Sequence, residues 1–252
     1  MHIMKNNKYT FGDVTFEVEL PVPLSDDNNC VDFLSERNPD YTIRILIVDE
    51  VDSNTSMAER NGNQITRFFR NGMPNKLAIA SLFADSKVAF VFPDHDAFIL
   101  HASYILYKGK AVLFTAPSGT GKTTQAQFWR DVHGAEIING DRVLVTKRNG
   151  IFYANGIYAS GTSGICKNIT APVGAVVLLE QGEHDEILPI PPRMLFLRIL
   201  CECSYDLRDS HQCEKITELV SDMINALPAI CYRCTKSPDA AVTLERILWN
   251  RQ

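Results

Sequence analysis

The stretch Ala116-Pro117-Ser118-Gly119-Thr120-Gly121-Lys122-Thr123 decides the fold. The apolar run 111–114 precedes it directly, and a helix-forming segment, residues 124–133, follows it and ends at Gly134. A strand, a glycine-containing loop and a helix in this order are the context of a phosphate-binding loop. Its glycines let backbone N–H groups approach a phosphate closely, and the start of the helix adds partial positive charge. We therefore predict that this loop binds the phosphates of a nucleotide.

The residues of this loop have separate predicted roles. Lys122 is expected to reach the β- and γ-phosphates, and the Thr123 hydroxyl to ligate Mg²⁺. The other residues expected to bind the nucleotide are Ser118, Gly119, Thr120, Gly121 and Thr124. Ala116 stands where the strict pattern has its first glycine, and an alanine is tolerated there if its φ is negative. The alternative is a chance turn between a strand and a helix.

Length, composition and charge narrow the class of protein. The 252 residues suffice for one α/β domain or for a core domain with a smaller partner. The hydrophobic content of 45% is ordinary for a globular protein, and the formal net charge of −5 argues against broad nucleic-acid binding. No signal peptide is evident, and no stretch approaches the ~18 apolar residues of a membrane span. We therefore expect a cytoplasmic protein with neither nucleic acid nor membrane as a partner.

The seven cysteines leave two interpretations open. Their odd number, without a secretory context, favours reduced thiols. A zinc or iron–sulfur site is the alternative, because several thiols and one imidazole lie close together in the sequence. These residues are Cys201, Cys203, His211, Cys213, Cys231 and Cys234. The first two fall in an apolar helical pattern, residues 195–203, and the last two in a predicted strand, so reduced core thiols are preferred.

Residues 1–96 predict a β-rich subdomain that supports or covers the nucleotide site. Apolar and polar side chains alternate along residues 14–18 and 42–48, as in half-buried antiparallel strands. Residues 25–29 and 52–63 are predicted loops, because Asn, Asp, Ser and Gly are frequent in them. Residues 66–70 and 76–83 supply further apolar segments around a turn at Asn71-Gly72. We find no catalytic constellation in this part.

Residues 97–252 predict a mixed sheet around the phosphate loop. A hairpin, 97–107 and 111–115, delivers the loop, and a second hairpin is predicted at 142–147 and 151–154 around Asn149-Gly150. Hairpins on both sides of the loop strand differ from the strict strand–helix alternation of doubly wound folds. Asp141 follows a short buried strand, 136–138, which we expect beside the loop strand. There its carboxylate could hold Mg²⁺, although an aspartate in a turn is often only a turn former.

The remainder of the chain completes this predicted domain. Residues 155–164 are small and polar, and form either a mobile lid near the γ-phosphate or a plain connection, with the cation Lys167 after it. The predicted strands are 173–179 and 228–235, with an exposed turn at 183–186. The predicted helices are 192–203, 214–227 and 238–249, the last capped by Ser237.

Residues 101–141 resemble the catalytic domain of the HPr kinase/phosphorylase family, which shares its core with phosphoenolpyruvate carboxykinase. The matching pieces are residues 100–103, 109–113, the phosphate loop and 134–142. Residues 156–161 resemble a diverged form of a Gly-Thr-Pro-Trp-Ser-Gly-like segment that follows in relatives associated with peptide modification or amino-acid phosphorylation. Specific matches cover about 60 residues, weaker similarity extends to the C-terminus, and the first 95 residues carry no motif that we can name.

The resemblance implies a mixed-sheet core, ATP with Mg²⁺, and phosphoryl transfer to a hydroxyl. It places Lys122 and Thr123 on phosphate and metal, Asp141 at the family's acidic pair, and His101 on a strand facing the γ-phosphate. Gly140 replaces one acid of that pair, so Asp141 alone would serve as metal ligand and general base, or His101 would be the base. The arginine-containing C-terminal signature of the bifunctional enzymes is missing, which argues against phosphorylase activity.

We therefore predict an α/β protein with a mixed-sheet P-loop core at residues 97–252 and a β-rich subdomain at residues 1–96. The predicted function is an ATP-dependent kinase with Asp141, Lys122 and His101 as catalytic residues and Thr123 and Asp141 as metal ligands. The acceptor is a serine of a peptide or small protein, or a small hydroxylated metabolite. A non-catalytic ATP-binding accessory protein, for example in peptide maturation, is the alternative. Homo-oligomers are known among the relatives, but the sequence indicates no interface.

Overall fold

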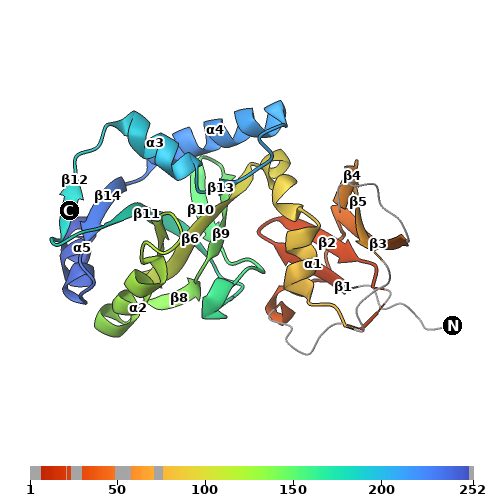
Figure 1. Cartoon of the computed structure of the whole chain (residues 1–252), viewed down its shortest axis with the longest axis horizontal. Helices are drawn as coiled ribbons and strands as arrows, with labels where there is room; N and C mark the ends of the chain where they lie inside the picture. The colour runs from red at the N-terminus through yellow and green to blue at the C-terminus, as the bar shows by residue number, and fades with distance from the viewer. Residues whose placement is uncertain (1–6, 21, 24–29, 49–57, 71–75, 250–252) are drawn as a thin grey trace. The chain divides into compact units, whose positions relative to one another are not determined.

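The computed structural model describes residues 7–20, 22–23, 30–48, 58–70 and 76–249 (Figure 1). The chain divides into two compact units, Met1–Ala89 and Phe90–Gln252. Both units combine strands with helices, and the second contains a large mixed sheet, so the predicted α/β class is confirmed. Across the described ranges, no helix has the length and apolar content that would carry it through a bilayer.

The first unit is built on a five-stranded sheet in the order β1-β2-β3-β5-β4. The strands are β1 (Asn7–Phe11), β2 (Val14–Val18), β3 (Tyr41–Val48), β4 (Ala58–Asn61) and β5 (Gln64–Arg70), and the helices are η1 (Val31–Phe33) and α1 (Ile79–Asp85). Aromatic rings form a large part of the core of this unit, together with aliphatic side chains. The ring of Phe83 lies 5.0 Å from that of Phe11 and 5.8 Å from that of Phe16, each pair edge to face.

Three predictions for this unit are wrong in part. Strand β3 pairs in parallel with both β2 and β5, so the alternating pattern of residues 42–48 does not reflect an antiparallel strand. Residues 58–61 of the predicted loop 52–63 form strand β4. The predicted apolar segment 76–83 leads into helix α1, because its buried residues Ile79, Leu82 and Phe83 recur at helical spacing. The predicted loop 25–29 and the turn at residues 71–72 lie outside the described residues.

The second unit is built on a nine-stranded sheet with the main order β10-β9-β6-β7-β11-β14-β12. The strands are β6 (Ala97–Tyr107), β7 (Lys110–Thr115), β8 (Glu136–Asn139), β9 (Arg142–Arg148), β10 (Ile151–Asn155), β11 (Thr170–Gln181), β12 (Glu186–Leu188), β13 (Cys203–Ser204) and β14 (Ala229–Cys234). Strand β10 also pairs with β11, so β10, β9, β6, β7 and β11 form a closed circuit. Both predicted hairpins are confirmed, and Asn149 and Gly150 have the positive φ values, 51° and 79°, that a two-residue turn requires.

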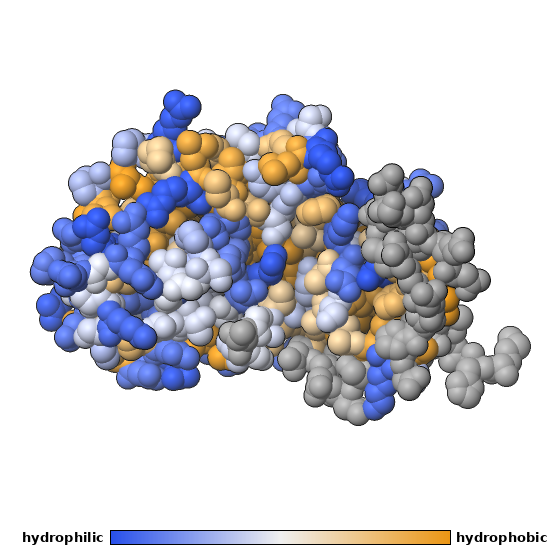
Figure 2. All heavy atoms as spheres, in the orientation of Figure 1, coloured by the Kyte–Doolittle hydropathy of each residue, from blue (hydrophilic) through white to orange (hydrophobic). Residues whose placement is uncertain are grey.

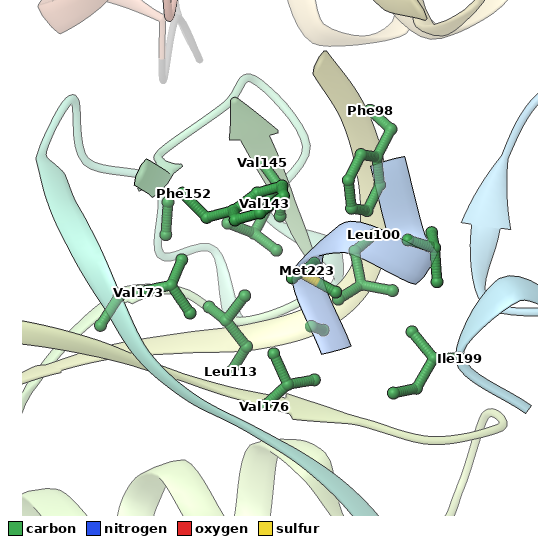
Figure 3. Packing of buried hydrophobic residues seen from close by; sticks show 14 of the residues in the cluster. Phe98, Leu100, Leu113, Val143, Val145, Phe152, Val173, Val176, Ile199 and Met223 are labelled. Atoms are coloured by element: carbon green, nitrogen blue, oxygen red, sulfur yellow. The ribbon is translucent and has the colours of Figure 1, made fainter. Parts of the chain in front are cut away.

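Helices cover both faces of this sheet. They are α2 (Lys122–His133) and α5 (Asp239–Trp249) on one side, and α3 (Pro192–Leu200) and α4 (Ser210–Ala226) on the other, with the short η2 (Val88–Phe90), η3 (Phe92–His95) and η4 (Gly161–Ser163) in connections. Alternate residues of β7 face opposite cores, since Leu113 packs toward α3 and α4 whereas Val112 and Phe114 pack toward α2 and α5. Figure 3 shows the first core, with Leu113, Val143 and Phe152 of the strand circuit turned toward Met223 of α4.

The C-terminal elements match the predictions with shifted limits. Helix α3 ends at Leu200, and Cys203 belongs to strand β13, so the predicted helix 192–203 is too long. Helix α4 begins at Ser210, where the Asp209 carboxylate caps the backbone N–H groups of His211 and Gln212. On the face drawn in Figure 2, hydrophobic side chains reach the surface over α3, where Met194 and Leu197 are exposed.

The cysteines do not assemble a metal site in the described part of the chain. No disulfide joins any of the seven cysteines, and Cys30, Cys231 and Cys234 are buried. Burial raises the pKa of Cys234 to about 11, which keeps its thiol protonated at neutral pH. No group of three or more His, Cys, Asp or Glu side chains is placed to hold an ion among the residues described.

Candidate functional site

The predicted phosphate loop connects the end of β7 to the start of α2. Gly119 and Gly121 adopt φ values of 80° and 112°, which turn the backbone into α2 in a way that only glycine does without strain. Ala116 is buried and has no positive φ, so an alanine fits there as predicted. Ser118 and Gly119 are exposed, and Thr123 and Thr124 are half-buried in the first turn of α2. Backbone N–H groups at a helix start are suited to bind phosphate oxygens.

The Lys122 side chain folds back over this loop. Its Nζ atom donates to the carbonyl oxygens of Ala116 at 2.7 Å and Pro117 at 3.3 Å, and the residue is only 7% exposed. Burial lowers the pKa of Lys122 from its ordinary value, while the carboxylates of Glu202 and Asp141 act in the opposite direction. A buried ammonium whose hydrogen-bond acceptors are two neutral carbonyls is well suited to pair with a phosphate anion.

Asp141 and His101, both predicted site residues, lie together, and a second carboxylate joins them. His101 Nε2 lies 3.4 Å from Asp141 Oδ1, and His101 Nδ1 lies 3.0 Å from Glu202 Oε2. The hydrogen bond from His101 is the main reason that the pKa of Asp141 is below its ordinary value, and Arg142 and Lys122 add to this effect. Glu202 was not predicted, because it follows helix α3 in a cysteine-containing segment far from the motif in the sequence.

A network of hydrogen bonds fixes the position of Asp141. The Asn139 carbonyl oxygen Oδ1 accepts from the backbone N–H groups of Asp141 and Arg142, and the Asn139 Nδ2 group donates to the Ile157 carbonyl. Strand β8, which leads to Asp141, pairs with β6 rather than with the loop strand β7. The expectation that Asp141 follows a strand beside the loop strand is therefore wrong. Strand β6, which carries His101, lies between β8 and β7, and Asp141 and Lys122 still interact electrostatically across it.

The space beside Gly140 is filled by Ser163. A Cβ atom at Gly140 would lie 2.2 Å from Ser163 Oγ and 2.6 Å from Ser163 Cβ. Ser163 is itself held, because its hydroxyl donates to the Ser160 carbonyl at 2.7 Å. The segment that contains these serines also approaches Asp141, since a Cβ at Gly161 would lie 2.7 Å from Asp141 Cβ. No side chain larger than that of glycine fits at position 140 without movement of Ser163.

The segment predicted as a lid or a connection is partly packed into the protein. Gly156, Ile157 and Tyr158 are buried, so the first half of residues 155–164 is fixed. The second half, which includes η4, lies against Asp141 as described above. Lys167 does not join the phosphate loop, because its Nζ atom pairs with Glu136 at 2.8 Å. This cation is therefore engaged elsewhere on the surface.

Strand β11 supports the phosphate loop from the other side. Its last residue, Gln181, donates through Nε2 to the carbonyl oxygens of Gly119 and Thr120, both at 3.2 Å. A cavity of about 430 Å³ opens beside the loop. Its lining consists of Gly119, Thr120, Gly121, Thr124, Gln125, Gln181, Gly182, Cys234, Thr235 and Lys236. The volume is in the range of small-molecule sites, and the cavity borders the start of α2.

Two oxygen-bearing side chains, Thr123 and Asp141, are the candidates to hold a magnesium ion near the loop. Mg²⁺ is usually bound through one or two carboxylates together with phosphate oxygens and water, so it does not need a complete protein cage. Thr123 offers a hydroxyl in the first turn of α2, and the Asp141 carboxylate is 31% exposed with a lowered pKa, hence ionised at neutral pH. These are the two predicted metal ligands.

Comparisons with known proteins add little to this description. The sequence matches no known family model, and no curated protein is significantly similar to it. Among solved structures, the Hpr(Ser) kinase/phosphatase from Coxiella burnetii is similar to it, with 16% sequence identity and a TM-score of 0.30. The match covers 37% of this chain and 66% of that one, just under two thirds of its length. A likeness of this size leaves the function to be argued from the site itself.

Proposed function

We propose that this protein binds ATP with Mg²⁺ at residues 116–124 and transfers the γ-phosphoryl group to a hydroxyl, as an HPr kinase-like phosphotransferase. The observation that carries the proposal is the meeting of Lys122, at the phosphate loop, with the cluster of Asp141, His101 and Glu202. A phosphate loop alone supports binding. A positioned carboxylate beside the loop lysine is what phosphoryl transfer requires in addition.

In the proposed complex, the loop amides and Lys122 hold the phosphates and Gln181 keeps the loop in shape. Lys122 exchanges its carbonyl acceptors for phosphate oxygens, and its charge stabilises the negative charge that develops during transfer. The nucleoside lies in the cavity that Thr124, Gln125 and Thr235 line. Burial of Lys122 strengthens its interaction with phosphate, because the local dielectric is lower than in water.

Asp141 orients the acceptor hydroxyl toward the γ-phosphate. Its pKa is lowered by His101, so it is a weak base, and its main contribution is to accept the hydroxyl hydrogen bond in the correct geometry. A loose transition state needs little proton removal before the phosphoryl group moves. Thr123 and Asp141 would hold Mg²⁺, which supplies charge neutralisation of the phosphates when bound. His101, held by Glu202, keeps the Asp141 carboxylate in place.

A non-catalytic ATP-binding protein is the second candidate, and one observation favours it. Ser163 occupies the space beside Gly140 where the second acid of the related kinases would project. Without an acid at position 140, the site has one carboxylate fewer to bind metal or to activate the acceptor. Both candidates bind ATP, and they differ in whether a phosphorylated product forms.

A thermal melt with and without ATP and Mg²⁺ tests the binding that both candidates share. Ligand at about a hundredfold over its dissociation constant should add roughly 2.7 kcal/mol, which raises the Tm by roughly 5–10 °C for a chain of this size. We expect this rise in the wild type and in Lys167→Ala, the matched lysine control, but not in Lys122→Ala. Absence of a rise in the wild type would refute both candidates.

Mass spectrometry of hydroxyl-bearing peptides and metabolites after incubation with ATP then separates the kinase from the non-catalytic ATP-binding protein. A phosphate addition that Asp141→Asn abolishes supports the kinase.

A further inference from the structure

A carboxylate with two arginine partners stands at the open side of the phosphate loop. Glu180 is near the end of β11, which runs parallel to the loop strand β7. In this register Leu178 lies opposite Thr115, so Glu180 lies level with the first residues of the loop. Its Oε1 atom lies 2.5 Å from Arg198 Nη1, and its Oε2 atom lies 3.7 Å from Arg233 Nη2.

Arg198 faces the loop. Together with Pro117, Ser118, Gly119, Thr120, Glu180 and Gln181 it lines a cavity of about 450 Å³ that is wide open to solvent, and it is the one cation among the described residues of this lining. The side chain comes from α3 and is 31% exposed, so it is neither locked in the core nor fully solvated. Besides Glu180, the Arg198 Nη1 group contacts Cys231 Sγ at 3.7 Å, which is a weak interaction.

Arg233 is held differently, although it shares the same carboxylate. Its Nη1 group donates to Glu186 Oε1 at 3.0 Å, and its chain packs over Gly182, where a Cβ atom would lie 2.3 Å from Arg233 Cδ. Arg233 does not line the cavity at the loop. Departure of Arg198 would therefore leave Glu180 with a charged partner, whereas departure of Arg233 would break two ion pairs.

We infer that Arg198 is a further residue of the phosphate site: it leaves Glu180 and pairs with the phosphate oxygens of the bound nucleoside triphosphate. This inference rests on the proposed function. The carboxylates of Asp141 and Glu202 act on Lys122, and Glu180 lies beside the loop, so a polyphosphate gains from a cation in addition to Lys122 and Mg²⁺. The planar guanidinium can form two parallel hydrogen bonds with a phosphate, and exchange of one anion for another keeps it paired throughout.

Binding of two probes to matched variants tests this inference. The probes are ATP with Mg²⁺ and inorganic triphosphate, which has no base or ribose and so reports on the phosphate contacts alone. We expect Arg198→Gln to weaken the binding of both probes by about tenfold or more. Arg198→Lys should weaken it less, because lysine keeps the charge but cannot form the two parallel hydrogen bonds. Arg233→Gln is the matched control and should stay within about twofold of the wild type.

Substitution of Glu180 separates a direct contact from an indirect one. Glu180→Gln releases Arg198 from its ion pair, so binding should be as tight as in the wild type or about two- to threefold tighter. If Arg198 contacts phosphate, the double variant Glu180→Gln with Arg198→Gln stays about tenfold weak. Recovery of wild-type affinity in the double variant would overturn the inference, because it would show that Arg198 only neutralises Glu180. Unchanged binding of both probes by Arg198→Gln would overturn it as well. Failure of the wild type to bind either probe would refute the proposed function instead.

Discussion

The ammonium group of Lys122 lies almost completely inside the protein, with the carbonyl oxygens of Ala116 and Pro117 as its acceptors. Burial of a charge without an ion-pair partner at hydrogen-bond distance opposes folding, and the lowered pKa of Lys122 reflects this opposition. The same arrangement favours binding, because a phosphate anion gains most where the cation is poorly solvated. Function and stability therefore make opposite demands on this one side chain.

We expect Lys122→Met to stabilise the nucleotide-free protein by about 1 kcal/mol at neutral pH, since methionine has a similar length without a charge. The pKa of Lys122 is lower in the folded chain than its ordinary value of 10.5, so between the two values the unfolded chain binds more protons. The wild type should therefore gain stability relative to the variant as the pH rises through this window. Urea unfolding of both proteins at about pH 7 and about pH 10 measures the difference between their free energies of unfolding.

The difference in free energy of unfolding between Lys122→Met and the wild type should be smaller at the higher pH. Other titrating groups affect both proteins equally, so the difference isolates Lys122. Lys167→Met is the control, because Lys167 forms a surface ion pair with Glu136 and should change stability by about 0.5 kcal/mol or less. A difference that stays constant or grows with pH would mean that burial does not penalise the charge of Lys122.

Single residues of the site differ in how far the sequence predicts them. Lys122, Asp141 and His101 were predicted because spacing or resemblance marks each of them, and the structure brings them together. Glu202 reaches His101 across 101 positions of sequence, and no local pattern distinguishes it from a surface glutamate. Arg198 has the same property: only the packing of α3 near β11 places it at the loop.

At the scale of elements, helix α2 connects the phosphate loop to a hydrophobic core. Its first turn carries Lys122, while Trp129 near its other end is fully buried. The Trp129 ring lies 5.2 Å from Tyr107, 6.0 Å from Phe114 and 5.9 Å from Trp249. Its indole Nε1 atom is buried without a hydrogen-bond partner in the described structure. Trp129 therefore contributes through shape and apolar area, and its N–H group adds nothing favourable.

We predict that Trp129→Phe lowers the free energy of unfolding by less than about 1.5 kcal/mol, whereas Trp129→Ala lowers it by about 3–5 kcal/mol. The phenyl ring keeps most of the aromatic contacts and removes the unpaired N–H group, but alanine leaves a cavity under α2. Denaturant unfolding of the two variants measures the difference. Equal losses in both variants would show that the indole N–H group is engaged after all.

Local patterns specify the elements better than they specify strand partners. The two hairpins around the loop were predicted, because turn residues and adjacent strands are neighbours in the sequence. The parallel pairing of β3 and the position of β8 beside β6 were not, since alternation along a strand is the same for either partner. Helix α1 was taken as an extended apolar segment because it has only seven residues, too few for a helical period to be distinct.

At the scale of the whole molecule, all residues of the proposed site belong to the second unit, Phe90–Gln252. The predicted domain, residues 97–252, leaves out residues 90–96, which the structure assigns to this unit. Asp94 pairs with His211 at 3.4 Å and Asp96 with Lys215 at 3.7 Å, so this segment is tied to helix α4. These ion pairs are long-range contacts, which the sequence does not reveal.

We predict that residues 90–252 fold alone and bind ATP as the whole chain does. This unit has two hydrophobic cores of its own, which begin at Phe98 and Ile105, and no described residue of the first unit contributes to either core. A length of about 160 residues is typical of an independent domain. The isolated unit should melt cooperatively, and ATP with Mg²⁺ should raise its Tm by the same roughly 5–10 °C as in the full chain. A cooperative melt without this rise would show that the first unit is needed for nucleotide binding, and the absence of a cooperative melt would show that the two units fold together.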